Sequence, residues 1–101
     1  MRIHNLSRLR AFWQQFPDAE KPLRAWYGLV ERAQWENPAD AKTMFGSVDF
    51  VENNRLIFNI GGNKYRMIVM VNYAFHVVYV CFLGTHKQYD HVDAANVWEI
   101  E

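Results

Sequence analysis

A dense group of titratable side chains lies near the C-terminus, in the stretch GTHKQYDH at residues 84–91. It follows VVYVCFL at residues 77–83, which is almost entirely apolar and has the length of a buried strand. Histidine, tyrosine and aspartate can transfer protons or bind metals, and lysine binds anions. The stretch is therefore a candidate for a solvated turn, a metal site or a site of proton transfer.

A second polar group lies about twenty residues earlier, in FNIGGNKYRMIVMV at residues 58–71. Gly61 and Gly62 permit a tight turn between two strands. Lys64 and Arg66 are two residues apart, so on a strand both side chains are expected on the same face. Taken alone, the pair is more simply explained as two solvated charges beside a turn.

Strand pairing joins the two groups. If residues 76–83 pair antiparallel with residues 64–71 through a turn at 72–75, the end of one strand lies beside the start of the other. His86 and Lys87 are then expected near Lys64 and Arg66. Such a convergence favours a functional site more strongly than either group alone.

Metal binding and cysteine chemistry fit this site poorly. His86, Asp90 and His91 offer metal ligands, but the two neighbouring cations would oppose a divalent ion. Cys81 lies in the middle of a predicted strand with no base near it in sequence, which disfavours it as a nucleophile.

RNA cleavage fits the residue types better. It requires a base for the 2′-hydroxyl, an acid for the departing 5′-oxygen and cations for the charge on phosphorus. The candidate proton-transfer residues are His86, Tyr89 and Asp90. The candidate phosphate-binding residues are Arg66, Lys64 and Lys87. Tyr89 or Phe58 could stack on a base, while Asn59 and Asn63, first of all turn and strand-end residues, are secondary candidates for RNA contacts.

The elements that position these residues change character halfway along the chain. Apolar residues at helical spacing predict one helix that stops at Pro17 and a second, capped by Asp18, that ends at Asn37-Pro38. The second half is rich in β-branched and aromatic residues separated by short turns. We expect an α+β fold, with an N-terminal helical hairpin packed on a three- to four-stranded antiparallel sheet and a short closing helix around residues 92–98.

Composition narrows the class of protein further. The 101 residues suffice for a single domain, spanning residues 1–101. Lys and Arg number 11, as do Asp and Glu, so nucleic-acid binding must rest on a local patch rather than on a global field. No apolar run reaches the roughly 20 residues that cross a bilayer. A single cysteine and the lack of a recognisable signal peptide favour a reducing cytoplasm, with no membrane partner.

The paired motifs resemble a known family. FNIGGNKYRMIV, followed some twenty residues later by THKQYD, is similar to the HigB toxins of bacterial toxin–antitoxin modules, within the RelE-like superfamily. The two-helix start, the NPAD segment and the order of the motifs also match, so the resemblance covers essentially the whole chain. Motif for motif, the basic residues correspond to Lys64 and Arg66, and the proton-transfer set to His86, Lys87, Tyr89 and Asp90.

The resemblance implies a RelE-like fold and a cytoplasmic endoribonuclease, and because of the neighbouring cations we expect this enzyme to be metal-independent and without cofactors. Such a toxin cuts mRNA during translation in the ribosomal A site and is neutralised by a HigA-like helix-turn-helix antitoxin. The complex would bind operator DNA through the antitoxin. A different class of function stays open, a non-catalytic module with a toxin-like fold that acts only within an antitoxin and operator complex.

Overall fold

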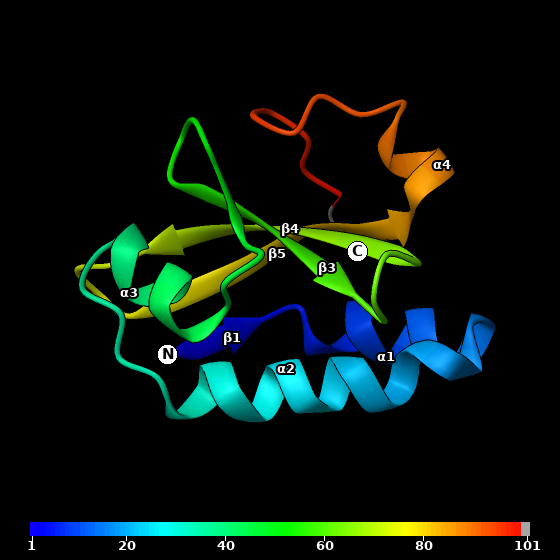
Figure 1. Ribbon diagram of the computed structural model, residues 1–101, viewed down its shortest axis with the longest axis horizontal. Helices are drawn as coiled ribbons and strands as arrows, with labels where there is room; N and C mark the ends of the chain where they lie inside the picture. The colour runs from blue at the N-terminus through cyan, green and yellow to red at the C-terminus, as the bar shows by residue number, and fades with distance from the viewer. Residues whose placement is uncertain (100–101) are drawn as a thin grey trace.

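The computed structural model describes residues 1–99. The chain forms a sheet with a helical layer on one side and a C-terminal segment on the other (Figure 1). The helices are α1 (Leu6–Gln15), the 3-10 turn η1 (Pro17–Ala19), α2 (Glu20–Arg32), α3 (Pro38–Met44) and α4 (His86–Tyr89). The strands are β1 (Arg2–His4), β2 (Asp49–Val51), β3 (Arg55–Ile60), β4 (Tyr65–Asn72) and β5 (Val77–Thr85). None of the helices in this part of the chain is long and apolar enough to cross a membrane.

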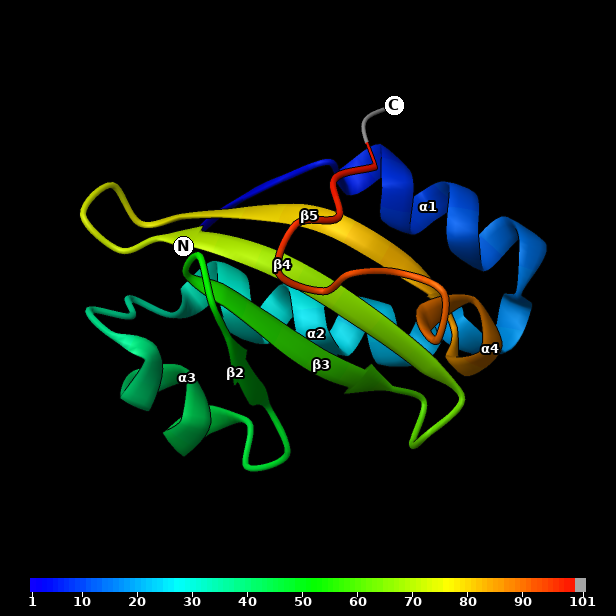
Figure 2. The ribbon, with the colours of Figure 1, turned by 90° about the horizontal axis from the view of Figure 1, so that it is seen from above.

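The sheet has the strand order β1-β5-β4-β3-β2 (Figure 2). Strands β2 to β5 form the predicted antiparallel meander, with four strands. Strand β1 was not predicted, and it adds a fifth strand parallel to β5, with Arg2 opposite Val77. The sheet is therefore mixed. Three residues are too few to show an alternating pattern, which explains why the sequence did not reveal β1.

The helical hairpin of α1 and α2 is confirmed, but its boundaries differ from the prediction. Pro17 stops α1 as expected and opens η1, so Asp18 lies in that turn rather than capping α2. Helix α2 ends at Arg32, five residues before Asn37. Asn37 instead caps the additional helix α3, where its side chain accepts a hydrogen bond from the Asp40 backbone N–H.

Both faces of the central strands are covered, as their apolar sequences predicted. On the helical side, one core joins residues of α1, α2 and α3 to alternate residues of β3, β4 and β5. On the other side, a smaller cluster centred on Ile68 and Phe82 is covered by side chains from the C-terminal segment. This second cover holds the C-terminal residues against the sheet.

The closing helix predicted around residues 92–98 is wrong in its position. The short C-terminal helix is α4, directly after β5, and the chain beyond it crosses the sheet without regular structure (Figure 2). Buried Arg55 fastens this segment by donating from Nη1 to the backbone oxygens of Ala94 and Val97. At its end, the Glu99 N–H donates to the Cys81 carbonyl oxygen at 2.8 Å.

Candidate active site

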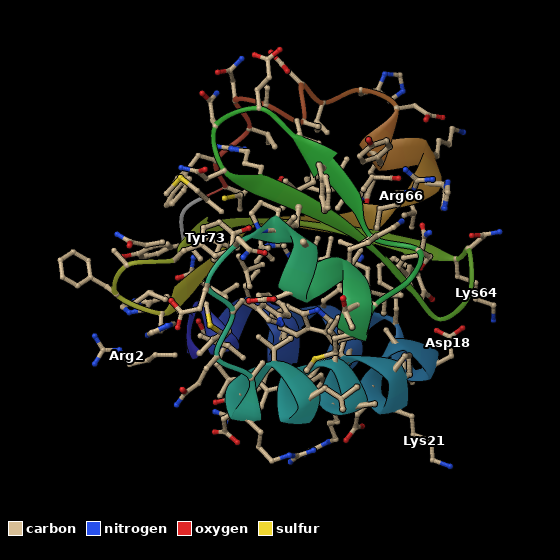
Figure 3. All side chains as sticks on the ribbon, turned by 60° about the vertical axis from the view of Figure 1, so that its left-hand side comes forward. Arg2, Asp18, Lys21, Lys64, Arg66 and Tyr73 are labelled. Atoms are coloured by element: carbon tan, nitrogen blue, oxygen red, sulfur yellow. The ribbon has the colours of Figure 1, made fainter. Side chains whose placement is uncertain are left out.

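Arg66 lies at the start of β4, on the face of the sheet that carries α4 (Figure 3). Its register partners are Asn59 on β3 and Gly84 on β5. Its guanidinium carbon stands 4.8 Å from the centroid of the Tyr89 ring, within range of cation–π attraction. Its Nε atom is buried and finds no hydrogen-bond partner among residues 1–99. An arginine oriented by an aromatic ring rather than by a carboxylate keeps its donors available for an anion.

His86 begins α4 immediately after β5. Thr85 caps this helix in a capping box, in which its hydroxyl oxygen accepts from the Gln88 N–H and the Gln88 side chain accepts from the Thr85 N–H. Thr85 is also the register partner of Tyr65, so the start of α4 is tied to the start of β4. The half-buried His86 side chain has its Nε2 atom buried and unpartnered in the described structure. The sequence-based convergence of the 84–91 stretch with Arg66 is thus confirmed in space.

Tyr89 follows His86 by three residues, which places both on one side of the short helix. The Tyr89 ring packs against Phe82 on β5, with 6.4 Å between ring centroids, and its other neighbour is the Arg66 guanidinium. Tyr89 thus contacts Arg66, with His86 one turn earlier on α4, and these three residues at one end of the sheet are hereafter called the Arg66 cluster.

Gly84 makes room for this arrangement. A Cβ atom added there would lie 2.7 Å from the Gln88 Oε1 atom and 2.7 Å from the Phe82 ring. Either distance is well inside van der Waals contact, so a side chain at this position would displace the Phe82 ring or the Gln88 amide that caps α4. A supporting role for Gly84 and Gln88 was not predicted from the sequence. The spacing Thr85-x-x-Gln88 is typical of a capping box and could have identified Gln88 from the sequence.

Asn59 borders the Arg66 cluster from β3. Its side chain lies directly across from Arg66 in the strand register, and its Oδ1 atom is buried with no partner in the described residues. Asn63, in contrast, is exposed in the turn before β4. Asn59 is therefore the better placed of the two predicted RNA-contacting asparagines.

Lys64 does not share a strand face with Arg66, so the prediction that the two side chains lie together is wrong. Strand β4 begins only at Tyr65, and Lys64 lies in the preceding turn, where its Nζ pairs with the Asp18 carboxylate at 2.7 Å (Figure 3). The Tyr65 hydroxyl donates to the same carboxylate at 2.5 Å. These two hydrogen bonds lower the pKa of Asp18, and its carboxylate raises the pKa of Tyr65 to about 12. Lys64 thus faces the helical layer, on the other side of the sheet from Arg66.

The prediction that Phe58 stacks on a base is also corrected. Phe58 is only 2% exposed and contacts three aromatic rings of the main core, those of Trp26, Trp35 and Phe45. Neither face of its ring is available to a nucleobase. The sequence suggested otherwise because an aromatic residue near a turn has the same pattern whether it packs inward or outward.

Lys87 and Asp90 lie exposed on α4 and just after it. Their side chains make no ion pair or hydrogen bond within residues 1–99. His91 is likewise exposed, in the turn that follows α4.

Cys81 is buried beneath the C-terminal segment, and burial raises the pKa of its thiol, which disfavours the reactive thiolate.

The Arg66 cluster can bind an anion and exchange protons next to it. Arg66 supplies fixed positive charge, while His86 and Tyr89 each offer a group that can donate or accept a proton. In residues 1–99, no three His, Cys, Asp or Glu side chains are arranged to hold a metal ion. The charge of Arg66 and the proton-exchanging groups of His86 and Tyr89 suit charge stabilisation and acid–base catalysis by side chains.

Comparisons with known proteins agree on one family. The model of the HigB toxin family, described as the RelE-like toxic component of a toxin–antitoxin system, matches residues 19–92. An mRNA interferase toxin HigB of Escherichia coli strain K12 is 27% identical over 85 residues, which cover 82% of each chain. An mRNA interferase HigB of Escherichia coli O6:H1 is 23% identical over 79 residues, or 76% of this chain and 77% of that protein.

Proposed function

This chain belongs to the HigB toxin family of RelE-like toxic components of toxin–antitoxin systems, and from this premise we propose that it is an endoribonuclease that cleaves mRNA and thereby inhibits translation. The relatives named mRNA interferase support the choice of substrate. The observation that carries the proposal is the Arg66 cluster, where the Arg66 Nε and His86 Nε2 atoms are buried with no partner in the described residues. Buried polar atoms without partners are rare in folded proteins and often mark a site that a ligand completes.

The proposed reaction is attack of a ribose 2′-oxygen on the adjacent phosphorus. One proton-transfer residue removes the 2′-hydroxyl proton as the O2′–P bond forms, and another protonates the 5′-oxygen as the P–O5′ bond breaks. His86 and Tyr89 form this pair, with exposed Asp90 as the alternative partner of His86. The products are a 2′,3′-cyclic phosphate and a 5′-hydroxyl, and no metal ion is required.

Arg66 stabilises the negative charge that develops on the phosphoryl oxygens. Exposed Lys87 adds a second cation from α4, and Asn59 contacts the RNA from β3. Lys64 is assigned at most a peripheral role in RNA binding, since it already pairs with Asp18. Asn63 is assigned the same role, because it lies exposed in the turn before β4. Arg66 therefore carries the main electrostatic role.

The ribosomal A site is the proposed place of cleavage. The chain has 11 basic and 11 acidic residues, so it has no net charge with which to attract free RNA. A ribosome would present a single strand of mRNA in a fixed conformation and so compensate for weak binding. The toxin would act in the cytoplasm, neutralised by a HigA-like helix-turn-helix antitoxin through which the complex binds operator DNA.

Induced expression without antitoxin tests the proposal. The wild-type protein should arrest growth and produce new mRNA 5′ ends, while Arg66→Ala and His86→Ala should each lose both effects. Lys21→Ala is the matched control, because it removes an exposed cation from the helical layer, away from the Arg66 cluster (Figure 3). Full cleavage by both site variants would show that the site is assigned wrongly. A stable antitoxin complex with no new 5′ ends would favour the non-catalytic module instead.

A further inference from the structure

A groove lies on the outer side of the helical hairpin, remote from the Arg66 cluster. It encloses about 220 Å³. Its lining residues are Leu6, Arg10 and Trp13 from α1 and Arg24, Tyr27 and Gly28 from α2. The two helices run antiparallel below the sheet, whereas α4 lies above it (Figure 1). The groove and the candidate active site therefore occupy opposite faces of the molecule.

The floor of the groove is apolar and only partly buried. Leu6, Trp13 and Tyr27 pack against the edge of the main core, yet each keeps part of its side chain exposed. Partly exposed apolar and aromatic side chains that line a hollow are typical of a protein-binding site.

Three arginines surround this floor. The Arg24 guanidinium lies over the Trp13 ring at 4.8 Å and pairs with Glu20 at 2.8 Å. Arg32 folds back so that its Nη1 atom stands 3.5 Å from the place of a Cβ on Gly28. Exposed Arg10 completes the set from α1. Within residues 1–99, neither Arg10 nor Arg32 has a carboxylate at ion-pair distance, so the groove is locally cationic in a chain of zero net charge.

Gly28 keeps the groove open although the fold does not require a glycine there. Its backbone is not in the left-handed region, and the only atoms that a Cβ at this position would approach belong to the flexible end of Arg32. Glycine destabilises the interior of a helix relative to alanine. A destabilising residue without a backbone reason is explained by the space it leaves for something that approaches α2 closely.

A protein suits this groove better than an RNA strand. The Trp13 ring already has Arg24 over one face, so it is not a free platform for a nucleobase. The helical layer also lies on the other side of the sheet from the cluster to which mRNA is assigned. The complementary partner has carboxylates for Arg10 and Arg32 and an apolar side chain for the floor.

We infer that the groove between α1 and α2 is a docking site for an acidic, amphipathic segment of the antitoxin. One apolar side chain of that segment would rest on Leu6, Trp13 and Tyr27, with its carboxylates paired to the arginines. The inference relies on the toxin role proposed above but not on the cleavage chemistry. Binding measurements therefore test it separately from RNA cleavage.

Titration calorimetry with the antitoxin that neutralises this toxin provides the test. All toxin variants are made in an Arg66→Ala background, so that the chain can be purified alone. Gly28→Glu should place a carboxylate and added bulk in the groove and weaken binding by about thirtyfold or more, as the loss of an interfacial charge pair does. The same substitution should leave the thermal stability equal or higher, because glutamate favours a helix more than glycine does.

Arg10→Glu combined with Arg32→Glu should weaken binding at least as strongly and reduce its dependence on salt. Lys21→Glu is the matched control, since it reverses a charge on the same helix but does not line this groove. Unchanged affinity in Gly28→Glu would overturn the inference, as would an equal loss in Lys21→Glu. Retained antitoxin affinity with lost ribosome binding would overturn it in favour of a nucleic-acid surface.

Discussion

Replacing Arg55 with methionine should release the C-terminal segment from the sheet. Arg55 is only 6% exposed and donates through Nη1 to the carbonyl oxygens of Ala94 and Val97. Its guanidinium also lies 5.9 Å from the Trp98 ring centroid. Methionine keeps a similar length and fills the same space, so the substitution removes the hydrogen bonds with little change in packing.

The expected loss follows from these contacts. Two hydrogen bonds from a charged donor contribute about 1.5–3 kcal/mol each. Methionine recovers part of that sum, because it removes a buried charge whose Nε atom has no partner in the described structure. A net loss of about 3 kcal/mol in the free energy of unfolding is expected, which lowers the melting temperature by roughly 15 °C in a domain of this size.

Urea denaturation and thiol labelling together measure this effect. Arg10→Met is the control, because Arg10 is exposed and its loss should change stability by under about 0.5 kcal/mol. Cys81 lies under the C-terminal segment and should react faster with an alkylating reagent in Arg55→Met. A loss of less than about 1 kcal/mol, with unchanged labelling of Cys81, would refute the view that Arg55 fastens this segment.

Three further predictions concern the site and its support. Asp18→Asn should flatten the pH dependence of stability at both extremes. The pKa of Asp18 is lowered in the folded state, so its contacts stabilise the fold above the unfolded pKa of about 3.9, and this stabilisation is lost as the pH falls. The pKa of Tyr65 is raised to about 12 in the folded state, so its hydrogen bond to Asp18 stabilises the fold fully below a pH of about 10, and this stabilisation is lost as the pH rises towards 12. Gly84→Ala should abolish mRNA cleavage by displacing α4 while the protein stays folded, as seen by far-ultraviolet circular dichroism. Phe58→Ala should cost about 3–5 kcal/mol in denaturant unfolding because Phe58 is a core residue.

Each of these has a contrary outcome. A pH–stability profile that Asp18→Asn leaves unchanged would show that its contacts with Lys64 and Tyr65 do not persist in solution. Full cleavage by Gly84→Ala would mean that α4 tolerates displacement. A Phe58→Ala variant of normal stability but weakened RNA binding would restore Phe58 as a stacking residue.

Periodicity predicted most of the fold because its main elements are long. The helical hairpin and the antiparallel meander each repeat their pattern over enough residues to be recognised. Strand β1 was missed, and the short C-terminal helix was placed too late in the chain, because these two elements contain three and four residues, too few to show a period. The three residues of β1 are also fixed by pairing with Val77–Tyr79, which local sequence does not encode.

The candidate site was predictable where it depended on strand pairing. A hairpin between β4 and β5 brings the end of β5 beside the start of β4, whereas the exact pairing of Gly84 with Arg66 is set by a register shift between Ile68 and Val69 that the sequence did not reveal. Lys64 was misplaced because its orientation depends on Asp18, a partner 46 residues away that no local pattern reveals. Phe58 was misplaced although β3 is apolar on both faces, a pattern that favours burial of Phe58, because its position near the turn was given more weight.

The pairing of β1 with β5 has a consequence for the timing of activity during synthesis. The second residue of the chain finds its partner at position 77, and the Arg66 cluster is complete only when Tyr89 is available. Because these contacts are distant in sequence, the sheet cannot close while the nascent chain is still being extended through that region. The Arg66 cluster therefore forms only after residue 89 has been added to the growing chain, late in synthesis.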